Sequence, residues 1–151
     1  MKPTVTWVLV ADGKRAQLYR NDGPARGLAR VPNGSFESDL PPTHAGAAIS
    51  ERPGRVQESA TSTRHGIEPR VDPRRAVKAA FAAELAGKLD AELARGAFQR
   101  LVLVAPPRIL GELREHLSPR GRAAVAGEIN KDLTHLGLPA LAERIGKVLA
   151  V

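Results

Sequence analysis

The residues of this sequence that are best suited to chemistry lie in a polar segment between about residues 41 and 72. The set consists of four arginines and one histidine: Arg52, Arg55, Arg64, His65 and Arg70. Guanidinium groups donate strong hydrogen bonds to phosphate oxygens, so the segment predicts a loop that binds nucleic acid or another anion. A solvated loop without a ligand is the alternative, because the segment lacks hydrophobic periodicity and is unusually long for a connection.

The histidines do not supply the further groups that a hydrolytic reaction would need. They are widely spaced along the chain: His44, His65, His116 and His135. No His-Glu-x-x-His pattern places two imidazoles on one helical face. His65 could act as a general base beside Arg64, whereas the other three are interpreted as surface residues. The glycine patterns of serine hydrolases, P-loops and dinucleotide-binding folds are absent, so we predict no catalytic residue and no cofactor.

The carboxylates give little support to metal-dependent cleavage. Asp12 is the only acid on the first predicted strand, and it stands at the strand's end, where an aspartate commonly caps a turn. Metal-assisted hydrolysis needs several carboxylates around the ion, and the fourth predicted strand ends in Ala-Pro-Pro at residues 105–107. The chain also has no cysteine. Asp12 therefore remains a possible strand-end site, and we predict no metal ion.

A second possible anion site lies at the carboxyl ends of two predicted parallel strands. There Asp12 and Gly13 should approach the segment 106–108. The N-terminus of the following helix and the guanidinium of Arg108 would attract an anion. Pro106 and Pro107 lack the amide donors that such a site uses, so a tight strand-to-helix turn is the alternative interpretation.

Hydrophobic periodicity predicts the elements that position these residues. Strands are expected at 5–11, 15–20, 27–31 and 99–105, and helices from Pro73 to Gly96, over 109–117 and from about 139. Asp72 is the expected N-cap of the long helix, and residues 123–129 fit either a strand or a helix. With a strand there, the order is βββαβαβα, an α/β fold with a ribonuclease-H-like mixed sheet in three layers. The 151 residues are expected to form a single domain.

The composition favours a polyanionic partner. The formal charge is +7 and the isoelectric point is near 10.5, which suits binding to RNA, DNA or an anionic surface. Arginine outnumbers lysine in this Ala- and Gly-rich chain, and GC-rich coding is an alternative source of that excess. Charged residues follow the first apolar run at once, so we predict no signal peptide, no membrane span and a cytoplasmic location.

Several short segments are informative through their order along the chain. They are Trp7 to Gly13 with Ala16, Pro53 to Arg55, Arg64 to Gly66, Asp72-Pro73, Phe81 with Leu85-Ala86, Leu101 to Pro107, Leu110 to Arg114 and Asn130 to Thr134. In this order they resemble the bacterial host-attachment protein family over nearly the whole chain. The resemblance implies kinship with the central domain of eukaryotic and archaeal-type peptide-chain release factors and a ribonuclease-H-like fold. It also implies either a role in attachment to host cells or contact with ribosomes or tRNA.

Release factors of that kind carry a Gly-Gly-Gln loop that positions water for peptidyl-tRNA hydrolysis. No two of the 14 glycines here are adjacent, and the nearest glutamine in the corresponding loop is Gln57. We therefore predict a non-catalytic binding module for RNA or a ribosome-associated partner, acting through the basic loop. An adhesion factor for host cells and a hydrolase that uses His65 or Asp12 are the alternatives.

Overall fold

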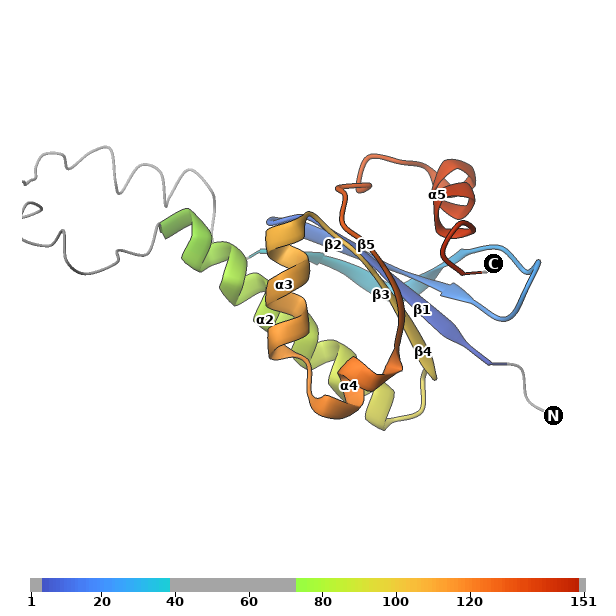
Figure 1. Cartoon of the computed structure of the whole chain (residues 1–151), viewed down its shortest axis with the longest axis horizontal. Coiled ribbons are helices and arrows are strands. Elements are labelled where there is room, and N and C mark those ends of the chain that lie inside the picture. The colour runs from blue at the N-terminus through green and yellow to red at the C-terminus, as the bar shows by residue number, and fades with distance from the viewer. Residues whose placement is uncertain (1–3, 39–72, 150–151) are drawn as a thin grey trace, which may run out of the picture.

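The protein folds around a five-stranded mixed sheet with the strand order β3-β2-β1-β4-β5 (Figure 1). The computed structural model describes residues 4–38 and 73–149. In chain order the elements are β1 (Thr6–Ala11), β2 (Arg15–Asn21), β3 (Ala29–Glu37), α2 (Pro73–Ala94), β4 (Arg100–Val104), α3 (Pro107–His116), α4 (Pro119–Ala124), β5 (Val125–Ile129) and α5 (Leu138–Ile145).

The central strand β1 organises the sheet, because every one of its residues is buried. It runs antiparallel to β2 and parallel to β4, so that Val10 lies opposite Gln17 on one side and Val104 on the other. Its aliphatic and β-branched side chains suit a strand that is covered on both faces. β5 is parallel to β4, so β1, β4 and β5 all run in the same direction. Their C-terminal ends therefore lie along the same side of the sheet, which we call the carboxyl edge.

Helices cover both faces of the sheet, so the fold has three layers. Successive side chains of a strand point to opposite faces of the sheet. Leu9 of β1 belongs to a core cluster with Leu85 of α2, whereas the next residue, Val10, belongs to a second cluster with Leu141 of α5. Figure 1 shows α2, α3 and α4 on one face and α5 on the other. Within the described residues, no helix is long and apolar enough to cross a membrane.

A carboxylate on α2 holds the beginning of α4. Asp90 accepts hydrogen bonds from the backbone N–H of Ser118 at 2.9 Å and from its hydroxyl at 2.8 Å. The Ser118 hydroxyl oxygen accepts the N–H of Gly121 at 3.0 Å, as the side chain of an N-cap residue does. These contacts explain why a helix of only six residues forms at this point.

The α/β fold class and its mixed sheet, predicted from the sequence, are confirmed, but the predicted element order is wrong by one helix. The sequence pattern does not predict α4, so the order over residues 4–38 and 73–149 is βββαβααβα rather than βββαβαβα. The ambiguous residues 123–129 contain the end of α4 and then the strand β5. A six-residue helix is too short to show hydrophobic periodicity, and its N-cap depends on a carboxylate from a distant helix.

The third strand also differs from the prediction, because β3 begins at Ala29 and continues to Glu37 instead of covering 27–31. Its middle is irregular. Pro32 has no N–H to donate, and Asn33 has a positive φ of 60°. The predicted N-cap Asp72 and the long segment 41–72 lie outside the described residues.

Candidate functional site

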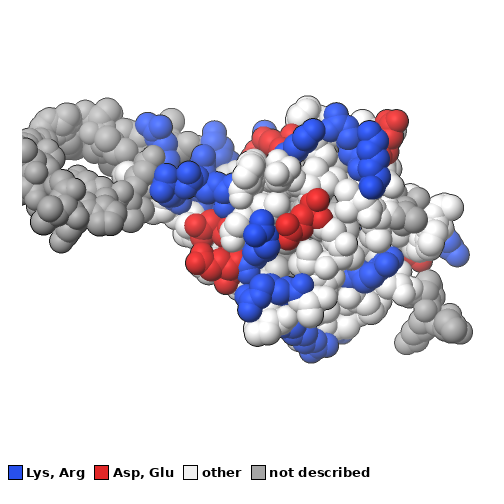
Figure 2. Space-filling view, viewed as in Figure 1, with Lys and Arg blue, Asp and Glu red and all other residues white. Residues whose placement is uncertain are grey.

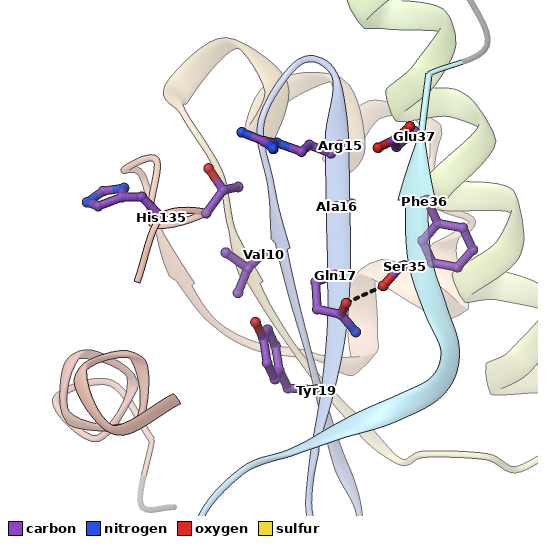
Figure 3. A pocket seen from close by; sticks show the side chains of 10 residues that line it. Val10, Arg15, Ala16, Gln17, Tyr19, Ser35, Phe36, Glu37 and His135 are labelled. Atoms are coloured by element: carbon purple, nitrogen blue, oxygen red, sulfur yellow. Dashed lines mark hydrogen bonds between the residues drawn. The ribbon is translucent and has the colours of Figure 1, made fainter. Parts of the chain in front are cut away.

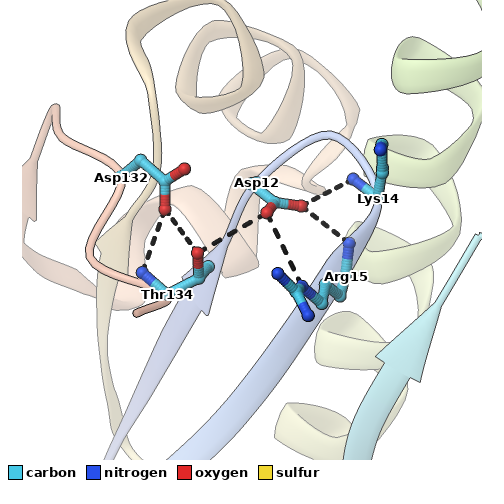
Figure 4. A network of polar contacts seen from close by, with 5 residues as sticks. All are labelled: Asp12, Lys14, Arg15, Asp132 and Thr134. Carbon is cyan, nitrogen blue, oxygen red and sulfur yellow. Dashed lines mark hydrogen bonds and ion pairs between the residues drawn. The ribbon is translucent and has the colours of Figure 1, made fainter. Parts of the chain in front are cut away.

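Asp12 follows β1 directly and closes the turn into β2 at the carboxyl edge. Its Oδ1 accepts the backbone N–H groups of Lys14 at 2.7 Å and Arg15 at 2.8 Å. The Nε of Arg15 lies 3.9 Å from the other carboxylate oxygen, Oδ2. The aspartate therefore caps a tight turn, and one of its oxygens is already committed to two amide groups (Figure 4).

A second carboxylate, in the loop after β5, faces the same turn. Asp132 Oδ1 accepts the hydroxyl of Thr134 at 2.5 Å and its backbone N–H at 3.0 Å. The hydroxyl also lies 3.5 Å from Asp12 Oδ2, but its single proton serves the shorter contact. The hydrogen bond from the Thr134 hydroxyl lowers the pKa of Asp132 from its ordinary value of 3.8; burial opposes this shift, and the Thr134 N–H and the charges of His135 and Arg15 add to it.

This network holds the loop after β5 against the hairpin turn. The two carboxylates come from opposite ends of the chain, and Thr134 lies between them (Figure 4). A divalent cation would require a larger set of oxygen or nitrogen ligands. Within residues 4–38 and 73–149, no group of three or more His, Cys, Asp or Glu side chains is arranged to hold a metal ion.

Basic side chains surround the same turn. Gly13 lies against α2, since a Cβ built on it would stand 2.7 Å from the Cγ of Lys78. Arg74 and Arg75 precede Lys78 by one helical turn and share its side of the helix. We call five exposed residues the basic patch: Lys14, Arg15, Arg74, Arg75 and Lys78. Figure 2 shows Lys and Arg side chains gathered where α2 begins.

The structure describes two of the seven residues that the sequence singled out as site candidates. Asp12 caps the turn, and Arg108 is exposed in the first turn of α3 without an ion-pair partner in the described part of the chain. The other five lie outside the described residues: Arg52, Arg55, Arg64, His65 and Arg70. The chain leaves toward them after Ser38, whose N–H donates to the carbonyl of Lys14 at 2.8 Å, and returns at Pro73 beside the basic patch.

A pocket of about 390 Å³ opens next to the turn, on the face of the sheet that α5 covers. The residues around it come from β1, β2, β3 and the loop after β5 (Figure 3). They include Val10, Arg15, Gln17, Tyr19, Ser35 and His135. Sequence reasoning missed this pocket, although the alternation of Arg15, Gln17 and Tyr19 on one face of the predicted second strand was a usable signal.

The segments that build this edge also occur in a known family. A family model described as "Protein required for attachment to host cells" matches residues 7–145, which extend from β1 to the last residue of α5. The chain belongs to this host-attachment family. Both the hairpin turn and the loop after β5 of the host-attachment protein lie inside the matched region.

Solved structures share the fold of this host-attachment protein at low sequence identity. A crystal structure of an archaeal translation termination factor aligns with a TM-score of 0.54 and 13% identity, covering 97% of this chain and 35% of the other. The host-attachment chain thus spans about a third of that structure, and the likeness shows the fold alone. A second structure, called an archaeal protein, gives a TM-score of 0.48 and 14% identity over the same shares. No curated protein sequence matches the chain.

Proposed function

We propose that this host-attachment protein binds RNA, free or within a ribosomal particle, without chemical turnover. The observation that carries the proposal is the basic patch, in which five exposed cationic side chains surround one turn. Lys14, Arg75 and Lys78 have no ion-pair partner among the described residues, so their charges are free to meet phosphate oxygens. Phosphate contacts of this kind provide most of the affinity of sequence-independent RNA binding.

The start of α2 adds to the positive potential of the patch. A helix N-terminus carries a partial positive charge, and the first turn of α2 contains no acidic residue. Three carboxylates lie nearby, namely Asp12 in the turn, Asp132 in the loop after β5, and Glu37, the register partner of Arg15 on β3. Five positive charges therefore face three negative ones, which supports attraction of a polyanion.

The arginines predicted to bind phosphate extend the same surface in this proposal. Arg52, Arg55, Arg64, His65 and Arg70 belong to the segment that joins the described fold at Ser38 and Pro73, on either side of the patch. Arg108 lies in the first turn of α3, the helix after β4, at the same edge of the sheet. We include these residues in the proposed RNA-binding surface.

The state of the carboxylates supports binding rather than hydrolysis. Asp12 accepts two amide N–H groups through Oδ1, and Asp132 accepts two hydrogen bonds from Thr134. A general base or metal ligand needs lone pairs directed at substrate or ion, whereas the Oδ1 atom of each carboxylate accepts hydrogen bonds from the protein's own amide and hydroxyl groups. In this proposal both carboxylates stabilise the carboxyl edge of the sheet. The protein is proposed to act in the cytoplasm.

The family description supports a second candidate function, attachment to host cells. The observation in its favour is the match of the family model over residues 7–145. In that case the basic patch would meet an anionic cell surface instead of RNA. Cell fractionation separates the two candidates, because recovery only from the envelope or the medium would contradict the cytoplasmic proposal.

A charge-neutral variant of the patch tests RNA binding. Lys14→Gln, Arg75→Gln and Lys78→Gln are combined in one protein, and its binding to labelled single-stranded RNA is measured by fluorescence anisotropy at increasing salt. Each neutralised phosphate of a single strand contributes about 0.7 to the slope of log affinity against log salt. If each of the three cations meets one phosphate, the slope should fall by about 2, with weaker binding to every sequence.

The matched control removes the same charge from the other end of the sheet. Arg26, Arg30 and Arg120 are exposed, lie near the β2–β3 connection or on α4, and have no ion-pair partner in the described part of the chain. Their combined replacement by glutamine should leave the salt slope unchanged. Equal slopes in the two triple variants, or wild-type protein that binds no RNA, would overturn the proposal.

In cell extract, the protein should sediment with ribosomes at low salt and leave them at high salt.

A further inference from the structure

We infer that the pocket beside the basic patch receives an unpaired nucleobase of the bound RNA, an inference that rests on the proposed RNA binding. The pocket's volume of about 390 Å³ is in the range of small-ligand sites. Arg15 belongs both to the patch and to the pocket wall (Figure 3). One nucleotide can therefore place its phosphate on the patch and its base in the pocket.

A tyrosine whose hydroxyl opens into the pocket forms part of its wall. Tyr19 is only 6% exposed, yet it lines the pocket. Its hydroxyl makes no hydrogen bond within the described residues, and Figure 3 shows it pointing toward Val10 and the side of the pocket that carries His135. Among the described side chains only Trp7 Nε1 is both buried and unpaired, so water reaches the Tyr19 hydroxyl, and a ligand atom can replace that water as its hydrogen-bond partner.

An amide group with spare hydrogen-bonding capacity lies beside the tyrosine. The Nε2 of Gln17 donates one N–H to the carbonyl of Leu18 at 2.9 Å, and its Oε1 accepts the hydroxyl of Ser35. A side-chain amide has two N–H donors and two acceptor lone pairs, so one of each remains. A donor next to an acceptor is the pattern that amide side chains use to read the edge of a base.

The charged groups around the pocket favour a base over a phosphate inside it. Arg15 and His135 are exposed planar groups at the rim, and such groups stack on unpaired bases. Glu37 also lines the pocket, and its carboxylate would repel an anion that entered. A neutral base enters without this repulsion, while its phosphate remains on the basic patch. Bases that are paired in a duplex cannot enter, so the pocket would select single-stranded RNA.

The single tyrosine of the chain permits a direct test. The full-length protein, with 3-fluorotyrosine in place of Tyr19, has one ¹⁹F resonance, located in the pocket. It is titrated with adenosine and uridine 5′-monophosphate, with a short single-stranded RNA, and with a duplex of the same sequence. We expect the single-stranded RNA to shift the resonance, the monophosphates to shift it only at higher concentration, and the duplex to leave it unchanged.

A variant of the pocket separates it from the patch. Tyr19→Phe retains the ring and removes the hydroxyl, so single-stranded RNA should bind about three- to tenfold more weakly. The variant should bind duplex RNA as wild type does and retain the wild-type salt slope, because the basic patch is unaltered. The triple variant of the patch should show the converse, with a reduced salt slope for both kinds of RNA.

The outcomes distinguish failure of the pocket from failure of the proposed function. An unchanged ¹⁹F resonance in a protein that still binds RNA through the patch would overturn the inference and leave RNA binding in place. Equal shifts with single-stranded and duplex RNA would also overturn it. A shift with monophosphates in a protein that binds no RNA would overturn both, because the pocket would then serve a free nucleotide.

Discussion

Replacement of Asp90 by alanine should loosen the junction between α2 and α4. The wild-type carboxylate accepts the N–H of Ser118 at 2.9 Å and its hydroxyl at 2.8 Å. A hydrogen bond to a charged group contributes about 1.5 to 3 kcal/mol, and a hydroxyl released to water recovers most of its share. Loss of the acceptor for the half-buried amide therefore dominates. We expect the free energy of unfolding to fall by about 2 kcal/mol.

Gly121 provides a test that this effect arises from the proposed contact. A Cβ at this position would overlap the Oδ1 of Asp90 and stand 3.0 Å from the Cδ2 of Leu117. Gly121→Ala should therefore destabilise the wild-type protein, chiefly through the carboxylate. In the Asp90→Ala background that overlap is gone, so the same substitution should cost less, and the two effects should not be additive.

Urea unfolding, followed by the fluorescence of the single tryptophan, Trp7, measures these free energies. Trp7 is buried in the cluster that contains α2 and α3, so its emission reports on the layer where the substitutions lie. Asp90→Asn, which keeps the shape and one acceptor, should fall between wild type and Asp90→Ala. The reasoning is refuted if Asp90→Ala lies within about 0.5 kcal/mol of wild type, or if the double variant is additive.

Three further predictions concern the loop, the core and the patch. Thr134→Val removes the hydroxyl donor, so the pKa of Asp132 should rise toward 3.8 in an NMR titration; an unchanged pKa would contradict the assignment. Because the pKa of Asp132 is depressed in the folded state, the stability that this group contributes is present above pH 3.8 and is lost as the pH falls through the depressed value. The free energy of unfolding of Thr134→Val should therefore fall less than that of wild type over this acid range. Leu141→Ala vacates a fully buried position and should lower the free energy of unfolding by about 2 to 5 kcal/mol; a loss under about 1 kcal/mol would contradict the packing of α5. Gly13→Ala should displace the side chain of Lys78 and shift its NMR signals while urea unfolding stays close to wild type, because a flexible side chain can move aside; unshifted Lys78 signals would contradict that contact.

The buried strands β1 and β4 could be predicted from sequence because a short, nearly continuous apolar run is enough to identify a strand that is covered on both faces. Every residue of β1 is buried and all but Thr6 are apolar, and β4 is apolar after Arg100, because both faces of these strands are covered. The path of β3 could not be predicted in the same way. It depends on the left-handed backbone of Asn33 and on a register shift opposite β2, and neither leaves a periodic signal. The helix α4 depends on Asp90, which lies 28 positions before its N-cap.

The candidate site was predictable only where it is local. Asp12 attracted attention because it ends a strand, and its role in the turn involves the next three residues. Thr134 approaches the same carboxylate across 122 positions, and no pattern of residue types announces that contact. The pocket requires the pairing register that places Gln17 opposite Ser35, and this register becomes known only with the sheet itself.

The strand β3, one of the two edge strands of the sheet, has a consequence for how the molecules behave in concentrated solution. Within residues 4–38 and 73–149, β3 pairs with β2 alone, so backbone groups on its other side are open to a neighbouring chain. A smooth margin of this kind is a template on which further strands accumulate and fibrils start. Pro32 supplies no N–H on β3, and the positive φ of Asn33 bends the backbone away from the extended strand direction. The row of backbone groups that could pair with another strand is therefore interrupted near the middle of β3. The irregularity that hides β3 from sequence patterns should thus also keep copies of this protein from pairing with one another through this strand.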